Sequence, residues 1–313
     1  MKILVIFTGG TIGSKVVGDK IAPSADTKFA LTENFLKNSF KNVSFEYAEP
    51  YFILSENLKA EHLNKLIFTV KGNLNKDYSG IIVTHGTDTL TFSAAALHYA
   101  LGETEIPVVL VSANYPLDDM RSNGNDNFKA AVDFIEKGVK GVFIAYKNNG
   151  ETTAFHSGDK VISFGEADDR LYSIYNKPFA EYKKGEISLL NAPLPFPEKT
   201  DFMFCESPNI LILSAMPGDS FSYSLEGVKA VILRPYHSGT FNTENEGFKN
   251  FCKKAKDLGV PLFLVCAPGG ITYETVSAYN ELGIIAFSGV PFSAAYIKIW
   301  AAISQNKNLK NLF

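Results

Sequence analysis

The chain lacks most of the features that would place it outside the ordinary globular proteins. Its three cysteines, Cys205, Cys252 and Cys266, show neither a CxxC pair nor a metal-binding spacing. No apolar run approaches the roughly 18 to 20 residues of a membrane helix. The first residues do not have the pattern of a signal peptide. The net charge of −3 gives no basic surface for nucleic acid. We therefore expect a cytoplasmic protein with reduced thiols, no bound metal, and no nucleic-acid or membrane partner.

What remains is an ordinary soluble composition, with 46% apolar and 20% charged residues, in a chain long enough for two domains. Apolar β-forming runs alternate with segments of helical periodicity through the first 145 residues, and this alternation predicts a doubly wound parallel sheet. The expected strands are 2–7, 43–48, 81–83, 108–111 and 142–145, and the expected helices are 32–38, 59–70, 90–101 and 127–137.

A proline-rich stretch interrupts this pattern. Three prolines within five residues, at positions 193, 195 and 197, exclude a helix or a central strand there. We therefore expect an N-terminal α/β domain over 1–190, a linker over 191–207, and a smaller C-terminal α/β domain over 208–313. The expected elements of the second domain are strands at 209–214, 228–233, 262–265 and 284–287, and helices at 247–257 and 292–305.

Two loops rich in threonine and glycine follow predicted strands. The first is Thr8-Gly9-Gly10-Thr11-Ile12-Gly13, and the second is Thr84-His85-Gly86-Thr87-Asp88-Thr89. Ligands of open α/β sheets bind at the carboxyl ends of the strands, so the two loops are expected to meet over one pocket. Neither GxGxxG nor a Walker sequence is present, which argues against a nucleotide. A glycine-rich structural turn is the plain alternative for the first loop.

The hydroxyl groups in these loops suggest nucleophilic chemistry. Thr11 follows two glycines that let the backbone approach a ligand closely, and a hydroxyl nucleophile needs an activating partner. The second loop offers Thr87 beside Asp88, which either binds a substrate ammonium group, orients a hydroxyl, or caps the following helix. For His85 we expect a hydrogen bond that stabilises the turn rather than acid–base chemistry.

The two loops resemble the two signature motifs of the bacterial-type asparaginase/glutaminase family, the threonine amidohydrolases. The second motif matches almost letter for letter over residues 80–89. The resemblance continues through 53–58, 112–116, 121–124 and 230–236, and it covers both expected domains. The cytoplasmic type I branch fits best, because the first motif ends in Ile12-Gly13.

The resemblance implies roles for individual residues. Thr11 would be the nucleophile that attacks the substrate carboxamide, and Thr87, Asp88 and Lys160 would form a second hydroxyl–carboxylate–amine triad. We place Lys160 at the end of the strand through Ala145. Further residues would bind the substrate through side chains or backbone N–H groups, and these are Ser55, Glu56, Gly10, Gly86 and Ala113.

Three departures from the family pattern bear on function. The family carries a tyrosine on the loop after the first motif, but residues 14–24 contain none. Glu56 stands where many asparagine-selective members carry glutamine or serine. The family also completes its site from a neighbouring subunit, for which Asn242 and Tyr273 are the candidates.

These observations predict a cofactor-free homodimeric or homotetrameric L-asparaginase that works through an acyl-enzyme, with glutaminase side activity left open. Two alternatives remain. One is an amino-acid-binding or sensing homologue with weakened catalysis, suggested by the missing tyrosine. The other is the asparaginase-like subunit of a glutamyl-tRNA amidotransferase, which we expect to need a further amino-terminal domain. The sequence does not determine the preference for asparagine or glutamine, or allosteric control.

Overall fold

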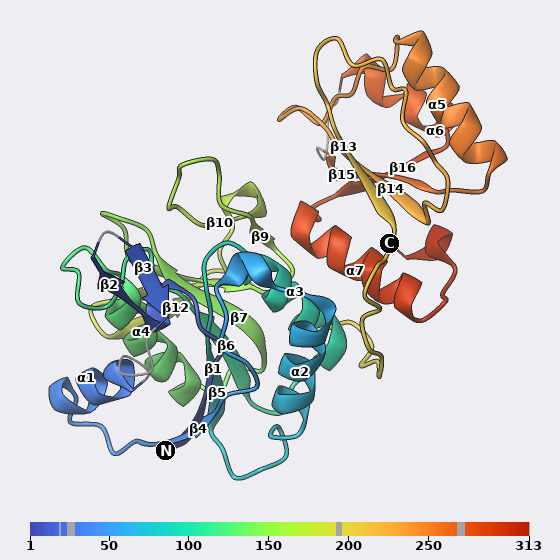
Figure 1. The fold of residues 1–313 in the computed structure, drawn as a ribbon. Helices are drawn as coiled ribbons and strands as arrows, with labels where there is room; N and C mark the ends of the chain where they lie inside the picture. The colour runs from blue at the N-terminus through green and yellow to red at the C-terminus, as the bar shows by residue number, and fades with distance from the viewer. Residues whose placement is uncertain (19, 24–28, 192–195, 268–272, 313) are drawn as a thin grey trace. The chain divides into compact units, whose positions relative to one another are not determined.

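The computed structural model describes residues 1–18, 20–23, 29–191, 196–267 and 273–312. The chain forms two compact units, Met1–Asp201 and Phe202–Phe313 (Figure 1). The division falls inside the segment expected to be the linker, of which positions 192–195 lie outside the described residues. Positions 19 and 24, in the loop that has no tyrosine, also lie outside them. No helix of the described residues is long and apolar enough to cross a membrane.

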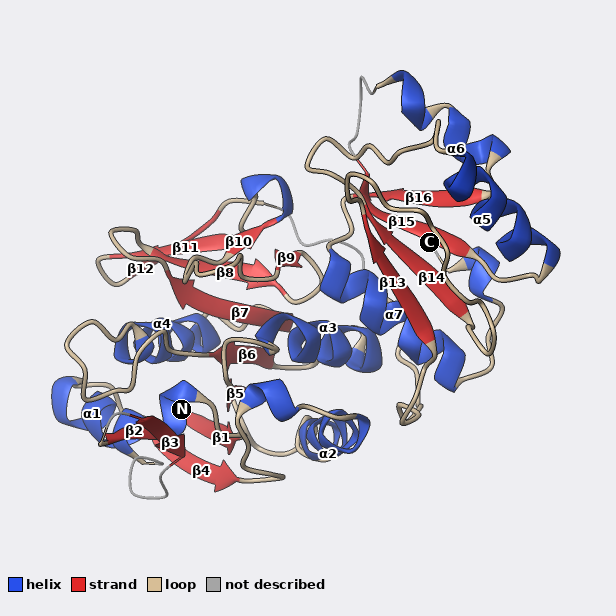
Figure 2. Cartoon of the chain, turned by 45° about the horizontal axis from the view of Figure 1, so that its top comes forward, coloured by secondary structure: helices blue, strands red, loops and turns tan. Residues whose placement is uncertain are grey.

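The first unit is built on an eight-stranded sheet with the order β12-β11-β8-β7-β6-β5-β1-β4, seen obliquely in Figure 2. Its strands are β1 Lys2–Phe7, β4 Ser44–Ala48, β5 Gly80–Thr84, β6 Pro107–Val111, β7 Gly141–Lys147, β8 Thr153–Ser157, β11 Ala180–Lys183 and β12 Glu186–Leu189. Strands β4, β1, β5, β6 and β7 are parallel, whereas β8, β11 and β12 are antiparallel to their neighbours. The predicted α/β class is confirmed, but the sheet is mixed, with β4 and β12 at its edges.

The parallel strands β1, β5, β6 and β7 are buried on both faces, as their uninterrupted apolar sequences indicate, whereas the edge strand β4 is largely exposed. In β1, Ile3 and Val5 belong to one hydrophobic cluster together with Phe35 and Phe128, while Leu4 is only 2% exposed although it points to the opposite face. Layers of helices must therefore cover both sides of the sheet.

Four helices form these layers. They are α1 Ala30–Asn38, α2 Ala60–Lys71, α3 Leu90–Leu101 and α4 Gly124–Glu136. Helix α1 packs beside α4, and α2 packs beside α3. All four agree with the helices expected from periodicity to within a few residues, which reflects the strong apolar stripe or, for α3, an apolar surface nearly all round.

Two small hairpins complete the first unit. They are β2 Ser14–Val17 with β3 Lys20–Pro23, directly after the first threonine loop, and β9 Val161–Ile162 with β10 Tyr172–Ser173. Single 3₁₀ turns occupy Thr11–Gly13, Ser55–Asn57 and Ile174–Asn176.

The second unit has a four-stranded parallel sheet in the order β13-β14-β15-β16, with its own hydrophobic clusters. Its strands are β13 Ile210–Ser214, β14 Ala230–Arg234, β15 Leu262–Ala267 and β16 Ile284–Ser288, and its helices are α5 Glu246–Asp257, α6 Ala278–Glu281 and α7 Phe292–Ser304, with 3₁₀ turns at Glu274–Val276 and Leu309–Asn311. All four strands and the two long helices correspond to predicted elements.

Candidate functional site

Three loops meet at the carboxyl edge of the large sheet. Strands β1 and β5 are parallel neighbours with Phe7 opposite Thr84, so both threonine loops leave the sheet at the same level. The segment that follows β4 joins them, because Gly9 forms an isolated parallel bridge with Ile53. The Gly10 N–H donates to the Ile53 carbonyl at 3.0 Å.

The two threonine loops touch through their glycines. A Cβ atom added to Gly10 would lie 2.2 Å from the Gly86 Cα and 2.3 Å from its nitrogen, so the two backbones are in direct contact. Gly10 also has φ 81 and ψ −177, a conformation that is essentially restricted to glycine. Thr11 and Thr87 are the next residue of each loop, and both are half-buried. The predicted convergence of the two loops is present.

Ser55 connects the third loop to Asp88. Its hydroxyl donates to the Asp88 Oδ2 at 3.2 Å, and its backbone carbonyl accepts from the Thr89 hydroxyl at 2.9 Å. A Cβ on Gly86 would lie 2.5 Å from the Ser55 Oγ. The structure thus brings Ser55 and Asp88 together above the glycine contact, with Asp88 exposed and Ser55 buried.

Asp88 does not cap helix α3. The N-cap position is Thr89, and no side chain there bonds to the helix N–H groups. The carboxylate is directed instead to Ser55. Of the roles weighed for Asp88, the capping role is therefore wrong, and a role in ligand binding stays a prediction.

Hydrogen bonds from two hydroxyl groups hold the threonine loops where they leave their strands. The Thr8 Oγ1 donates to the Thr84 carbonyl at 2.7 Å, and the Ser14 Oγ donates to the Gly10 carbonyl at 2.8 Å. These bonds are buried, so they hold the turn on either side of Thr11 in one geometry.

His85 has a structural role, as predicted. Its Nδ1 lies 2.8 Å from the Gly86 carbonyl, which can only accept, so Nδ1 carries the proton and Nε2 accepts from the Ser93 hydroxyl at 2.8 Å. Complete burial lowers the pKa of His85 to about 4. The ring is therefore neutral at pH 7 and both nitrogens are occupied.

The expected location of Lys160 is wrong in one respect. The chain turns back after β7 through Gly150, which has φ 76, so Lys160 follows the antiparallel strand β8 rather than the strand through Ala145. The loop that contains Lys160 packs on α3, because a Cβ on Gly158 would lie 2.9 Å from the Ala94 carbonyl. The participation of Lys160 in the triad stays a prediction.

A buried carboxylate lies beside this lysine. The Lys160 Nζ is 2.9 Å from the Asp159 Oδ2, and the Asp159 Oδ1 is 3.8 Å from the His98 Nε2. Burial opposes ionisation of Asp159, but His98 and Lys160 together hold its pKa below the ordinary value. The sequence did not indicate this cluster.

Ala113 follows β6, the strand next to β5, and thus lies at the same edge of the sheet as the threonine loops. Two asparagines hold the backbone around it. Asn127 donates to the Ser112 carbonyl at 2.8 Å, and Asn123 accepts from the Asn114 N–H at 3.0 Å. Neither asparagine was predicted from the sequence to have a role. Their i, i+4 spacing at a helix start was the available signal.

The remaining predicted residues are exposed. Glu56 is exposed next to Ser55, while Asn242 and Tyr273 lie in exposed loops of the second unit. Their roles in substrate binding and in a neighbouring subunit's site stay predictions. Among the described residues, no group of three or more His, Cys, Asp or Glu side chains could hold a metal ion.

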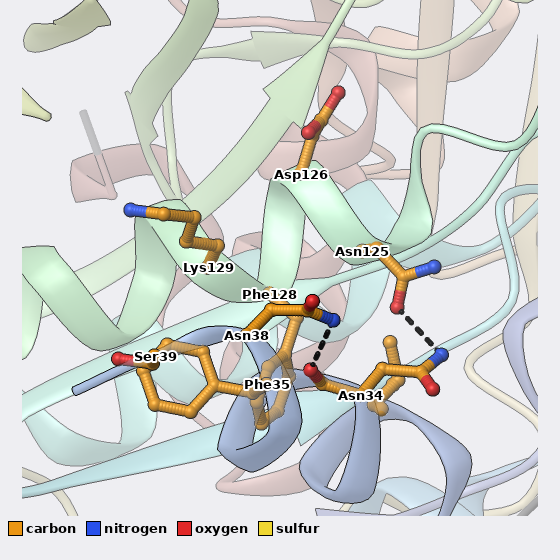
Figure 3. A pocket seen from close by; sticks show the side chains of 9 residues that line it. Asn34, Phe35, Asn38, Ser39, Asn125, Asp126, Phe128 and Lys129 are labelled. Atoms are coloured by element: carbon orange, nitrogen blue, oxygen red, sulfur yellow. Dashed lines mark hydrogen bonds between the residues drawn. The ribbon is translucent and has the colours of Figure 1, made fainter. Parts of the chain in front are cut away.

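Figure 3 shows a pocket of about 420 Å³ between α1 and α4. Its floor contains Phe35 and Phe128, and its rim carries amides, of which Asn34 donates to Asn125 at 3.3 Å. None of the predicted site residues lines it. A second pocket, of about 730 Å³, is lined by residues that include Asn114, the neighbour of Ala113.

Comparison with known proteins agrees with this geometry. The family model described as "Asparaginase, N-terminal" matches residues 2–194, more than half of the chain. The chain belongs to the asparaginase family. The resemblance recognised in the two threonine motifs is thereby confirmed.

Similar proteins extend the match over nearly the whole chain. L-asparaginase from Thermococcus kodakarensis is 24% identical over 329 residues and covers 100% of this chain and 95% of its own length. A solved structure of the thermostable L-asparaginase from Thermococcus kodakarensis has a TM-score of 0.78 to this fold. A probable cytoplasmic L-asparaginase from Campylobacter jejuni covers 99% of this chain and 97% of its own, at 19% identity and a TM-score of 0.76.

A second group of relatives has a different name. A glutamyl-tRNA(Gln) amidotransferase subunit from Sulfurisphaera tokodaii is 26% identical over 330 residues, covering 99% of this chain and 72% of that protein. The identities to the L-asparaginase and to the amidotransferase subunit are similar, so they do not distinguish between these two kinds of protein.

Proposed function

We propose that this asparaginase-family protein is a cytoplasmic amidohydrolase that converts L-asparagine and water into L-aspartate and ammonia. The observation that carries the proposal is the contact between Gly10 and Gly86, which brings the Thr11 and Thr87 loops to one place. Amide hydrolysis through an ester intermediate needs a nucleophile, a group that activates water, and donors for the oxyanion. The converging loops contain a nucleophile and water-activating groups, and the Ala113 N–H after the neighbouring strand β6 is the candidate oxyanion donor.

In the first half-reaction, the Thr11 hydroxyl attacks the carboxamide carbon, and the carbonyl oxygen becomes an oxyanion that accepts from the Ala113 N–H. Collapse of this intermediate breaks the C–N bond and releases ammonia, which takes up the proton of the Thr11 hydroxyl. In the second half-reaction, a water molecule activated by Thr87 with Asp88 and Lys160 attacks the ester, which regenerates Thr11 and gives L-aspartate.

Ser55 and Asp88 would bind the α-carboxylate and α-ammonium groups of the substrate. Their hydrogen bond of 3.2 Å supports this assignment, because it places a hydroxyl donor and a carboxylate acceptor side by side. Glu56 adds a negative charge next to Ser55, which favours a substrate with a free ammonium group. We propose a homo-oligomer, with Asn242 and Tyr273 near the site of a neighbouring subunit.

The test is ammonia release by the purified protein from L-asparagine and L-glutamine. Replacement of Thr11 or Thr87 by valine keeps the shape and removes the hydroxyl, and each should lower kcat on the order of 10⁴-fold. Thr69→Val is the matched control, because the Thr69 hydroxyl donates only to the Lys65 carbonyl within α2. No ammonia release by a folded wild-type protein would refute the proposal.

The amidotransferase relatives support a second candidate, an amide-hydrolysing subunit that works with a partner. Ammonia release from free asparagine by the protein alone favours the asparaginase. Release only when a partner subunit and aminoacylated tRNA are added favours the second candidate. Tight binding of asparagine without turnover, unchanged in Thr11→Val, would instead identify an amino-acid-binding protein.

A further inference from the structure

The two peptide groups on either side of Ala113 are both anchored by side chains at the start of helix α4. The Asn127 Nδ2 donates to the Ser112 carbonyl at 2.8 Å, and the Asn123 Oδ1 accepts from the Asn114 N–H at 3.0 Å. Asn127 is 0% exposed and Asn123 is 6% exposed. Two buried amides therefore determine the backbone at one residue.

Asn127 and Asn123 also hydrogen-bond to the backbone of β7 just beyond the point where its pairing with β6 ends. Val111 is opposite Ala145, so the 112–114 segment would run on beside Lys147. However, the Lys147 N–H donates to the Asn127 Oδ1 and the Lys147 carbonyl accepts from the Asn123 Nδ2, both at 2.8 Å. The amides occupy the backbone groups that would otherwise pair with this segment.

The Ala113 N–H itself has no acceptor among the described residues. Ala113 itself is 0% exposed. A buried backbone N–H without a partner is uncommon and costs free energy, so it needs an explanation. A donor reserved for a ligand is such an explanation.

Asn127 controls the direction of this donor. The Ser112 carbonyl and the Ala113 N–H belong to one planar trans peptide group and point in opposite directions, and the described chain contains no cis peptide bond. When Asn127 holds the carbonyl, it therefore fixes the direction of the N–H as well. Asn123 fixes the next peptide plane through Asn114.

We propose that Asn127 is a positioning residue that aims the Ala113 N–H at the carboxamide oxygen of the substrate. This inference rests on the proposed function and adds to it the origin of the oxyanion geometry. Loss of one oxyanion donor typically lowers kcat by about 10² to 10³-fold, since the donor acts on charge that develops in the transition state.

The chemically identical changes Asn127→Asp and Asn123→Asp test this assignment. In Asn127→Asp, an oxygen replaces the donor to the Ser112 carbonyl, while the acceptor for the Lys147 N–H remains. We expect kcat to fall about 10²-fold, with KM changing less than about threefold. In Asn123→Asp, the acceptor for the Asn114 N–H remains, and kcat should stay within about threefold of wild type.

Two further readouts separate positioning from a general loss of structure. In each variant a carboxylate replaces an amide that donates to a backbone carbonyl, that of Ser112 or that of Lys147, so both thermal unfolding temperatures should fall, while kcat should fall only in Asn127→Asp. The kcat ratio of Asn127→Asp to wild type should rise as the pH is lowered, because a protonated carboxyl regains the donor. Equal kcat values for the two variants would overturn the inference.

Crystal structures of both variants test the inference without reference to activity. The Ser112–Ala113 peptide plane should rotate in Asn127→Asp and keep its orientation in Asn123→Asp. An unchanged plane in Asn127→Asp would overturn the positioning role whatever the activity. If the plane rotates but wild-type protein releases no ammonia, the role of Asn127 stands and the proposed function fails.

Discussion

Replacement of Gly10 by alanine should separate the two threonine loops. The new Cβ would lie 2.2 Å from the Gly86 Cα, and no side-chain rotation can separate these two atoms. Ordinary van der Waals contact begins at 3.4 Å, so the loops must move apart by about 1.2 Å. A misplacement of about 1 Å costs on the order of 10² in rate. We therefore expect kcat to fall about 10²-fold, which corresponds to about 2.7 kcal/mol of the activation barrier.

The same substitution has a backbone cost. Gly10 has φ 81 and ψ −177, a region that costs other residues about 1–3 kcal/mol. Gly138→Ala is the matched control, since Gly138 also has a positive φ, of 67, but its Cβ would meet no atom within 4 Å. The control should lower the free energy of unfolding by about 1–2 kcal/mol and leave kcat unchanged.

Ammonia release under saturating asparagine and chemical denaturation measure the two quantities. The expected pattern is a loss of stability in both variants, and a loss of turnover only in Gly10→Ala. If Gly10→Ala keeps kcat within about threefold of wild type, then contact between the loops does not determine the reaction geometry.

Three further results are expected. Burial lowers the pKa of His85 and of His156 to about 4, so the unfolded chain binds more protons than the folded chain between about pH 6.5 and 4. Lowering the pH from about 7 to 5 should therefore reduce the free energy of unfolding by about 2 kcal/mol per histidine, as measured by urea denaturation. Equal stability at both pH values would contradict this. Ser55→Ala should raise KM for asparagine about tenfold with less effect on kcat, and the reverse pattern in initial rates would argue against a binding role. Gly158→Ala would place a Cβ 2.9 Å from a backbone carbonyl and should lower the free energy of unfolding by about 1–3 kcal/mol in thermal unfolding. Gly165→Ala, whose Cβ would meet its nearest atom at 3.5 Å, should not. Matching unfolding temperatures for the two variants would be inconsistent with tight packing at Gly158.

The sequence predicted those parts of the fold whose pattern is local. The strands β1, β5, β6 and β7 are continuous apolar runs, and α1 to α4 have helical periodicity, so each element could be assigned by itself. Strands β8, β11 and β12 were missed because they are short and mix polar with apolar residues, as in Glu186–Leu189. The error in placing Lys160 followed from the missed reversal at Gly150.

The candidate site was predictable to a similar extent. Each threonine loop has a local motif, and parallel pairing of β1 with β5 brings the loops together. The Ser55–Asp88 bond joins residues 33 positions apart, and the Asn127–Ser112 bond joins residues 15 apart. Contacts of this kind depend on how the elements pack, so spacing along one chain does not indicate them.

The edges of the large sheet restrict how copies of this chain can associate. Edge strand β4 carries Glu46, which pairs with Lys2 at 2.7 Å and accepts from Tyr78 at 2.5 Å, and edge strand β12 begins with the exposed Glu186. Charged side chains on edge strands oppose the addition of a strand from another molecule. An assembly of subunits would then be formed through helices, loops or the second unit, and the eight-stranded sheet would end within each subunit.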